Sequence, residues 1–203
     1  MKKRLLVALL AAAGFVSATA YAESPWMLRA RVANIDPSTS GSVAPGLDVD
    51  VDNSWGVTGD IVYFWTPNIS TTLLLTYPQK HDVSVSTIGA VGDVTQLPPT
   101  LTLDYHFNVG QGASIYVGAG VTWFYLTDDD LRLPNGTPID IDNSNFGPAI
   151  RVGLDYQLNK NWYLNIDIQK TWVSTDVSVP ALGISGDIDI DPWVYGVGVA
   201  YRF

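Results

Sequence analysis

The chain has 203 residues, a length that fits a single domain, and it contains no cysteine. Without cysteine it forms no disulfides and performs no thiol chemistry. Its formal net charge is −9 at pH 7, and all 20 acidic residues lie after position 22. This acidic balance argues against nucleic acid as a partner, because phosphate binding requires a basic surface.

The first 22 residues have the pattern of a secretory signal peptide. Basic residues at positions 2–4 precede an apolar run over 5–16, and the tripeptide Ala20-Tyr21-Ala22 offers a small-x-small cleavage site. We predict cleavage after Ala22, which leaves residues 23–203 as one mature domain. The alternative is a transmembrane anchor, but the apolar run is shorter than the ~20 residues that span a bilayer.

Beyond residue 22, apolar and other residues alternate with a period of two, which is typical of β-strands. We predict eight strands, near residues 25–35, 54–66, 69–78, 99–107, 113–126, 145–156, 162–172 and 188–203. Three connections are tight turns, and the other four are long and rich in Pro, Gly, Ser and Asp: residues 36–53, 79–98, 127–144 and 173–187. Short turns at one end and long loops at the other are typical of an outer-membrane barrel, with the short turns in the periplasm.

The two faces of the predicted strands differ in polarity. One face is uncharged and gathers aromatic residues near the strand ends, which suits the two membrane interfaces. The other face has no lysine or glutamate. Its charged or titratable residues are four arginines, four aspartates and one histidine: Arg29, Arg31, Asp60, Asp104, His106, Arg151, Asp155, Asp167 and Arg202. Arginine favours paired, partly buried sites, so we place this face in the lumen. The prediction is an all-β, eight-stranded antiparallel up-and-down transmembrane β-barrel, and the alternative is a soluble barrel with an apolar interior.

An eight-stranded barrel is wide enough only for side chains or for one small ligand. We expect five charged residues to pair and close the periplasmic floor: Arg29, Arg31, Asp104, Asp155 and Arg202. Inward apolar residues of the upper barrel form a candidate ligand pocket above this floor: Val62, Phe64, Leu74, Phe124 and Tyr163. Plain packing of a filled lumen is the alternative interpretation of these apolar residues.

Three prolines flank the junction of the third and fourth predicted strands. They are Pro78, Pro98 and Pro99. Proline lacks the N–H that a β-ladder needs, so we predict a seam in the barrel wall here, through which a solute leaves sideways. The alternative is that these prolines simply end their strands.

The C-terminus alternates apolar or aromatic residues up to Tyr201 and Phe203. This pattern resembles the assembly signal that outer-membrane barrels present to the barrel-insertion machinery. The stretch 191–203 also resembles the last strand of the outer membrane protein W family, and segments 97–101, 116–120, 152–156 and 159–162 agree with that family. The resemblance implies an eight-stranded barrel with a hydrophobic pocket that helps small apolar molecules through the outer membrane. Related members are associated with alkane uptake, and others are receptors exploited by bacteriocins. The first long loop departs from this picture, because it is poor in large apolar residues.

We consider three functions for this sequence. The first is passive passage of small hydrophobic molecules, and the second is a structural or receptor role in which the loops bind partners. The third is an enzyme, which we do not expect, because His81 and His106 lie in no convincing catalytic arrangement. We expect no cofactor. The acidic residues Asp128–Asp130, Asp140 and Asp142 form a solvated loop in our interpretation, and a divalent cation site is the alternative. Expected partners are outer-membrane lipid, lipopolysaccharide and the insertion machinery, and a closed barrel is expected to be a monomer.

Overall fold

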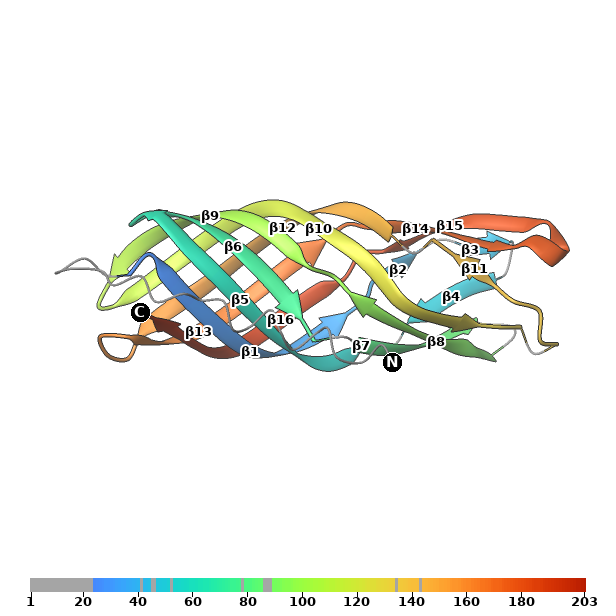
Figure 1. The fold of residues 1–203 in the computed structure, drawn as a ribbon, viewed down its shortest axis with the longest axis horizontal. Coiled ribbons are helices and arrows are strands. Elements are labelled where there is room, and N and C mark those ends of the chain that lie inside the picture. The colour runs from blue at the N-terminus through green and yellow to red at the C-terminus, as the bar shows by residue number, and fades with distance from the viewer. Residues whose placement is uncertain are drawn as a thin grey trace, which may run out of the picture.

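Eight strands close into one antiparallel barrel in the computed structural model (Figure 1), which describes residues 24–40, 42–44, 47–51, 53–77, 79–85, 89–133, 135–142 and 144–203. The barrel strands are β1 (Trp26–Asp36), β5 (Ser54–Thr66), β6 (Ile69–Thr76), β9 (Thr100–Gly110), β10 (Ala113–Leu131), β12 (Ser144–Gln157), β13 (Trp162–Thr171) and β16 (Trp193–Arg202). Each strand pairs with the next in this order, and β16 pairs with β1 to close the ring. The predicted fold class is confirmed. Among the described residues, no helix is long and apolar enough to cross a membrane.

The long connections contain strands of their own, and in this respect the sequence-based description of them as loops is wrong. They hold β2 (Thr39–Ser40), β3 (Ser42–Ala44), β4 (Leu47–Val51), β7 (Gln79–Val85), β8 (Gly89–Leu97), β11 (Asp140–Ile141), β14 (Ser174–Val179), a 3-10 helix η2 (Pro180–Leu182) and β15 (Ile184–Ile190). Strand β10 continues above the barrel and pairs there with β8, so the wall extends beyond the membrane on the side of the long connections. The predicted eighth strand is in fact two strands, because Pro192 cannot donate to a ladder and separates β15 from β16. In Figure 1 these extra strands project from the end of the barrel opposite the short turns.

The alternation of the strands places the apolar side chains outside, as predicted. Large hydrophobic residues such as Val57, Leu103 and Val197 are more than half exposed, which fits a surface that lipid covers. Aromatic residues form one group near the short turns and another near the long connections: Trp26, Tyr63, Trp65, Trp162, Tyr201 and Phe203, then Trp55, Tyr77, Trp123, Phe146, Trp193 and Tyr195. These two groups correspond to the two interfaces of a membrane.

Glycines on the inner face make room for large interior side chains. A Cβ added to Gly153 would lie 2.2 Å from Cζ of Tyr116, and one added to Gly118 would lie 1.9 Å from Oδ1 of Asp104. Each large polar side chain therefore lies over a glycine of a neighbouring strand. The interior can thus be filled by long polar side chains although the barrel is narrow.

Candidate functional site

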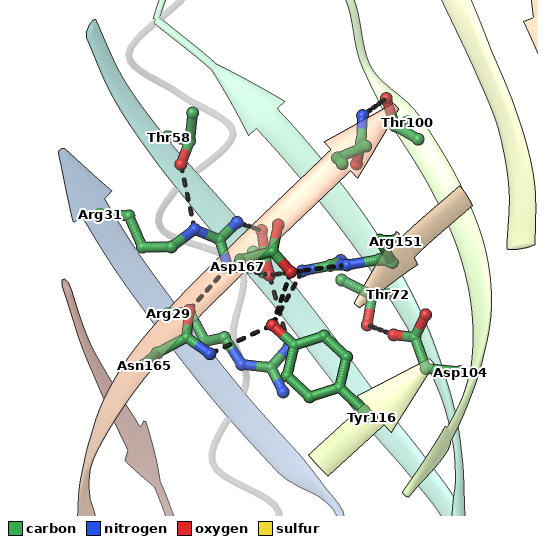
Figure 2. A network of polar contacts seen from close by, with 12 residues as sticks. Arg29, Arg31, Thr58, Thr72, Thr100, Asp104, Tyr116, Arg151, Asn165 and Asp167 are labelled. Carbon is green, nitrogen blue, oxygen red and sulfur yellow. Dashed lines mark hydrogen bonds and ion pairs between the residues drawn. The ribbon is translucent and has the colours of Figure 1, made fainter. Parts of the chain in front are cut away.

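The centre of the lumen is filled by a group of buried polar side chains, which we call the central ion network (Figure 2). It consists of Arg29, Arg31, Asp60, Tyr116, Arg151, Asp155, Asn165 and Asp167. Asp60 is its hub: Nη1 of Arg29, Nη1 of Arg31 and Nη2 of Arg151 lie 3.3, 2.9 and 2.9 Å from Oδ2 of Asp60. The network therefore joins β1, β5 and β12, which are not all neighbours in the wall, so its contacts cross the lumen.

Tyr116 stands at the middle of the central ion network. Its ring centroid lies 4.5 Å from Cζ of Arg29 and 5.1 Å from Cζ of Arg151, so two guanidinium groups contact one ring. Its hydroxyl donates to Asp167 over 2.7 Å and accepts from Nδ2 of Asn165 over 3.1 Å. A role for Tyr116 was not predicted from the sequence. The sequence feature that could have indicated such a role is a large residue at an inward position of the strand. In the structure this residue is paired in register with Gly153.

The charged side chains of the central ion network are buried and paired. The guanidinium and carboxylate side chains of its ion pairs are 0–4% exposed. Buried charges are tolerated when they are paired and hydrogen-bonded, as they are here, and separating them is costly. Moving these side chains apart would therefore separate several ion pairs at once.

A layer of uncharged polar side chains lies above the central ion network, towards the long connections. We call it the polar floor, and it consists of Thr100, Thr122, Gln169 and Thr171. Oγ1 of Thr122 lies 2.8 Å from Oγ1 of Thr100 and 3.3 Å from Oγ1 of Thr171, and Gln169 donates to the hydroxyl of Thr100 over 3.4 Å. All four residues are buried.

Above the polar floor the interior becomes apolar. The upper apolar cluster consists of Val91, Phe124, Leu126, Leu131 and Val173, and three partly buried isoleucines pack against it. Phe124 and Val173 each lie two residues beyond a threonine of the floor, on the same inward face. Of the five predicted pocket residues, Phe124 belongs to this cluster, and the buried Leu74 lies at the level of the floor, opposite Thr100.

The predicted position of the other three pocket residues is wrong. Val62, Phe64 and Tyr163 lie at the periplasmic end, where they form the lower apolar cluster with Met27 and Ala200. The reason is strand direction: β5 runs towards the short turn at 67–68 and β13 begins just after the short turn at 158–161, so these residues lie below the network.

The predicted ionic floor is also displaced. Arg29, Arg31 and Asp155 belong to the central ion network, and Asp104 accepts a hydrogen bond from Thr72 beside it. This layer lies in mid-barrel, with the lower apolar cluster between it and the short turns. Arg202 lies apart from it: its guanidinium is 4.3 Å from the ring centroid of Phe64, and its Nε donates to the carbonyl of Ser24. The periplasmic end is therefore closed by apolar packing capped by Arg202 and not by the ion pairs.

The barrel wall is interrupted beside the polar floor. The ladder between β6 and β9 stops at the pair Leu74–Thr100, and the next ladder, between β7 and β8, begins at Gln79–Gln96. Residues 75–76 and 98–99 form no ladder pairs with each other. The predicted seam residues Pro98 and Pro99 lie in this interval, and Pro78 lies outside the described residues.

The other candidate groups have no site-like surroundings among the described residues. His106 is buried in the closed interior, with Nε2 2.9 Å from Oγ of Ser70. No group of three or more His, Asp or Glu residues that could hold a metal comes together in the described part of the chain. The side chains of His81 and of Asp128–Asp130 lie outside what the structure describes.

The outer hairpin of β14 and β15 places two carboxylates opposite each other. Asp176 and Asp187 are cross-strand partners. A hydrogen bond with Asp176 and the charge of that residue raise the pKa of Asp187, which is exposed to solvent. Like charges directly opposite each other weaken a hairpin.

The C-terminal residues lie on the outer surface at the periplasmic end. The rings of Tyr201 and Phe203 make an edge-to-face contact with centroids 5.1 Å apart, and Phe203 is exposed. Their role as an assembly signal stays a prediction. Residues 1–23 lie outside the described residues, so the cleavage after Ala22 also stays a prediction.

A closed barrel with an apolar outer surface and a sealed polar centre is a bacterial outer-membrane β-barrel protein. The family model described as the OmpW family matches residues 23–203, and the chain belongs to this family. It is 37% identical to the uncharacterized outer-membrane protein y4mB of Sinorhizobium fredii, over 89% of this chain and 80% of that protein. It is 32% identical to the outer membrane protein AlkL of Ectopseudomonas oleovorans, over 83% of this chain and 74% of that protein.

Among solved structures, the crystal structure of the outer membrane protein OprG from Pseudomonas aeruginosa superimposes with a TM-score of 0.80. The two chains are 27% identical, and the match covers 89% of this chain and 97% of OprG. These proteins are outer-membrane barrels, so the predicted location in the outer membrane is confirmed. The family and fold are those of barrel proteins and not, in general, of enzymes.

Proposed function

We propose that this barrel lets small hydrophobic molecules cross the outer leaflet passively and leave sideways into the membrane. The solute enters among the long connections, reaches the upper apolar cluster and stops at the polar floor. It then leaves through the wall at the interruption between β6 and β9. Burial of apolar surface, at about 25 cal/mol per Å², provides the attraction for such a solute.

The observation that carries the proposal is the level at which the interior changes from apolar to polar. Thr100 is part of the polar floor, and as the first residue of β9 it forms the pair with β6 that lies nearest the long connections. The end of the apolar route therefore coincides with the interruption of the wall. Leu126 of the upper apolar cluster pairs in register with Gln96, two residues before Pro98, so the cluster adjoins the interruption.

Uptake of a small fluorescent hydrophobe into proteoliposomes tests the route. Replacing Pro98 and Pro99 by valine restores two N–H donors and favours pairing with β6, and we expect slower uptake. Pro67→Val, at a periplasmic turn, is the matched control and is expected to leave uptake unchanged. Equal uptake by the Pro98→Val, Pro99→Val double variant and the wild type, with both barrels folded, would remove the lateral exit from the proposal.

Blocking the interior tests the same proposal from the lumen. Leu74→Arg places a charge at the level of the floor, beside the interruption, and we expect it to abolish uptake. Uptake that survives Leu74→Arg would mean that the solute does not use the lumen.

A structural or receptor role is the second candidate. It is favoured by the hairpin of β14 and β15, which extends the protein beyond the barrel and presents exposed carboxylates. Replacement of residues 174–190 by a short linker would abolish binding of a bacteriocin or phage but leave uptake intact. In either case we propose a monomer surrounded by lipid and lipopolysaccharide, because a closed barrel has no free sheet edge.

A further inference from the structure

Four buried polar atoms of the barrel interior have no hydrogen-bond partner among the described residues. They are Oγ1 of Thr102, Oδ1 of Asp104, Nη1 of Arg151 and Oε1 of Gln169. Each of these residues is at most 3% exposed. Unsatisfied buried polar atoms are rare in folded proteins and are normally bonded to protein or to ordered water.

The four residues lie on β9, β12 and β13, which are linked in register through β10. Thr102 and Asp104 face inward from β9, and in register with them on β10 are Gly120 and Gly118, which have no side chains. Gly118 is in turn in register with Arg151 on β12, and Arg151 with Gln169 on β13. Gly118 thus lies between Asp104 and Arg151 in this row, and Oδ1 of Asp104 lies over it. Figure 2 shows Thr72 bonded to Asp104, and Oδ1 of Asp104 and Cγ of Arg151 both lie close to Gly118.

In this region Arg151 offers an unpartnered donor and Asp104 an unpartnered acceptor. Among the described residues, the side chain of Asp104 bonds only to the hydroxyl of Thr72, through its other oxygen. Arg151 uses Nε and Nη2 for Asp167 and Asp60, and Nη1 remains. A bridging group must accept from Nη1 of Arg151 and donate to Oδ1 of Asp104. A cation would be repelled by Arg151 and an anion by Asp104, whereas water meets both requirements.

We propose that this region is a water-binding site in mid-barrel, with at least one ordered water molecule bridging Arg151 and Asp104. A buried water makes about three hydrogen bonds, and Thr102 and Gln169 offer the additional partners. The site joins the central ion network to the polar floor, since Gln169 also bonds to Thr100. The water site does not depend on any solute, so it can be tested independently of the transport proposal.

The Thr102→Val substitution tests the water site, because the folding equilibrium constant should fall if water is bound and rise if the site is dry. With water bound, Thr102→Val removes a hydroxyl that is hydrogen-bonded, and the folding equilibrium constant of the full barrel in lipid vesicles should fall about fivefold. In a dry site the same change removes an unsatisfied group, and the constant should rise. Thr122→Val removes a hydroxyl that Thr100 and Thr171 already satisfy, so it must lower the constant in both cases and sets the scale.

Proton-detected solid-state NMR of the wild-type barrel in bilayers gives the direct readout. We expect cross peaks from water to the Nη1 protons of Arg151 and to the hydroxyl of Thr102. A folded barrel without these cross peaks would overturn the proposal. A change in the Asp104 and Thr102 signals when sodium is replaced by choline would identify a bound cation instead, and would also overturn it.

Discussion

Asp60→Asn removes the hub of the central ion network. The Asp60 side chain is fully buried and accepts hydrogen bonds from three arginines. After the change, Arg29 still faces Asp155 and Arg151 still faces Asp167. Among the described residues, Arg31 keeps the neutral partners Asn165 and Thr58, so one buried guanidinium loses its counter-charge.

The expected loss follows from that single orphaned charge. Breaking a buried ion pair by removing one partner costs about 3–5 kcal/mol, which is roughly a thousandfold in the folding equilibrium constant. Equilibrium unfolding in urea, with the barrel in lipid vesicles, measures this through tryptophan fluorescence. Asp155→Asn is the matched comparison and should cost less, because Arg29 retains Asp60 at 3.3 Å.

A compensating variant makes the test specific. In the Asp60→Asn, Arg31→Gln double variant the orphaned guanidinium is absent, so most of the lost stability should return. A loss below about 1 kcal/mol for Asp60→Asn, or a double variant as unstable as the sum of both single changes, would refute the assignment of Asp60 as the hub.

Three further outcomes are expected. Gly153→Ala should destabilise the barrel by about 3 kcal/mol or more in the same urea assay, because the new Cβ meets the buried ring of Tyr116; a neutral effect would contradict the packing described here. Because the pKa of Asp187 is raised in the folded hairpin, protonation favours that fold. The pairing of β14 with β15 should be strongest below the ordinary carboxyl pKa of about 3.9, and it should weaken as the pH rises through the raised pKa of Asp187. Hydrogen exchange in β14 and β15 measures this, and Asp187→Asn should remove the dependence. Phe64→Ala opens the lower apolar cluster, yet uptake of a hydrophobe should not change, and a marked increase would point to a route through the periplasmic end.

The barrel could be predicted from the sequence, because the polarity of the residues alternates with the period of two that a β-strand requires. The uncharged face with aromatic ends and the Arg–Asp face correspond to the lipid side and the lumen of the structure. The strands beyond the membrane were missed, since their pairing is non-local: β10 pairs with β9 below and changes to β8 above. The composition of residues 127–131 does not predict that β10 changes its pairing partner from β9 to β8.

The depth of each residue in the lumen was within reach of the sequence, but it was assigned wrongly for Val62, Phe64 and Tyr163. Strand direction and turn length together fix depth, and Phe64 stands just before a short turn. The contacts of the central ion network were beyond reach, because they cross the lumen between strands that are not neighbours. Asp60 on β5 bonds to Arg151 on β12, and pairing in the wall does not predict that contact.

The central claim is that a hydrophobic solute occupies the upper apolar cluster and not the lower one. It is tested most directly by adding a small paramagnetic hydrophobe to the barrel in lipid nanodiscs and recording methyl NMR spectra. Only inward methyl groups are informative, because lipid also dissolves the probe: Leu126 and Val173 report on the upper cluster, and Val62 on the lower one. We predict broadening of the Leu126 and Val173 signals with the Val62 signal unchanged, whereas broadening of Val62, or of none of the three, would contradict a solute site in the upper apolar cluster.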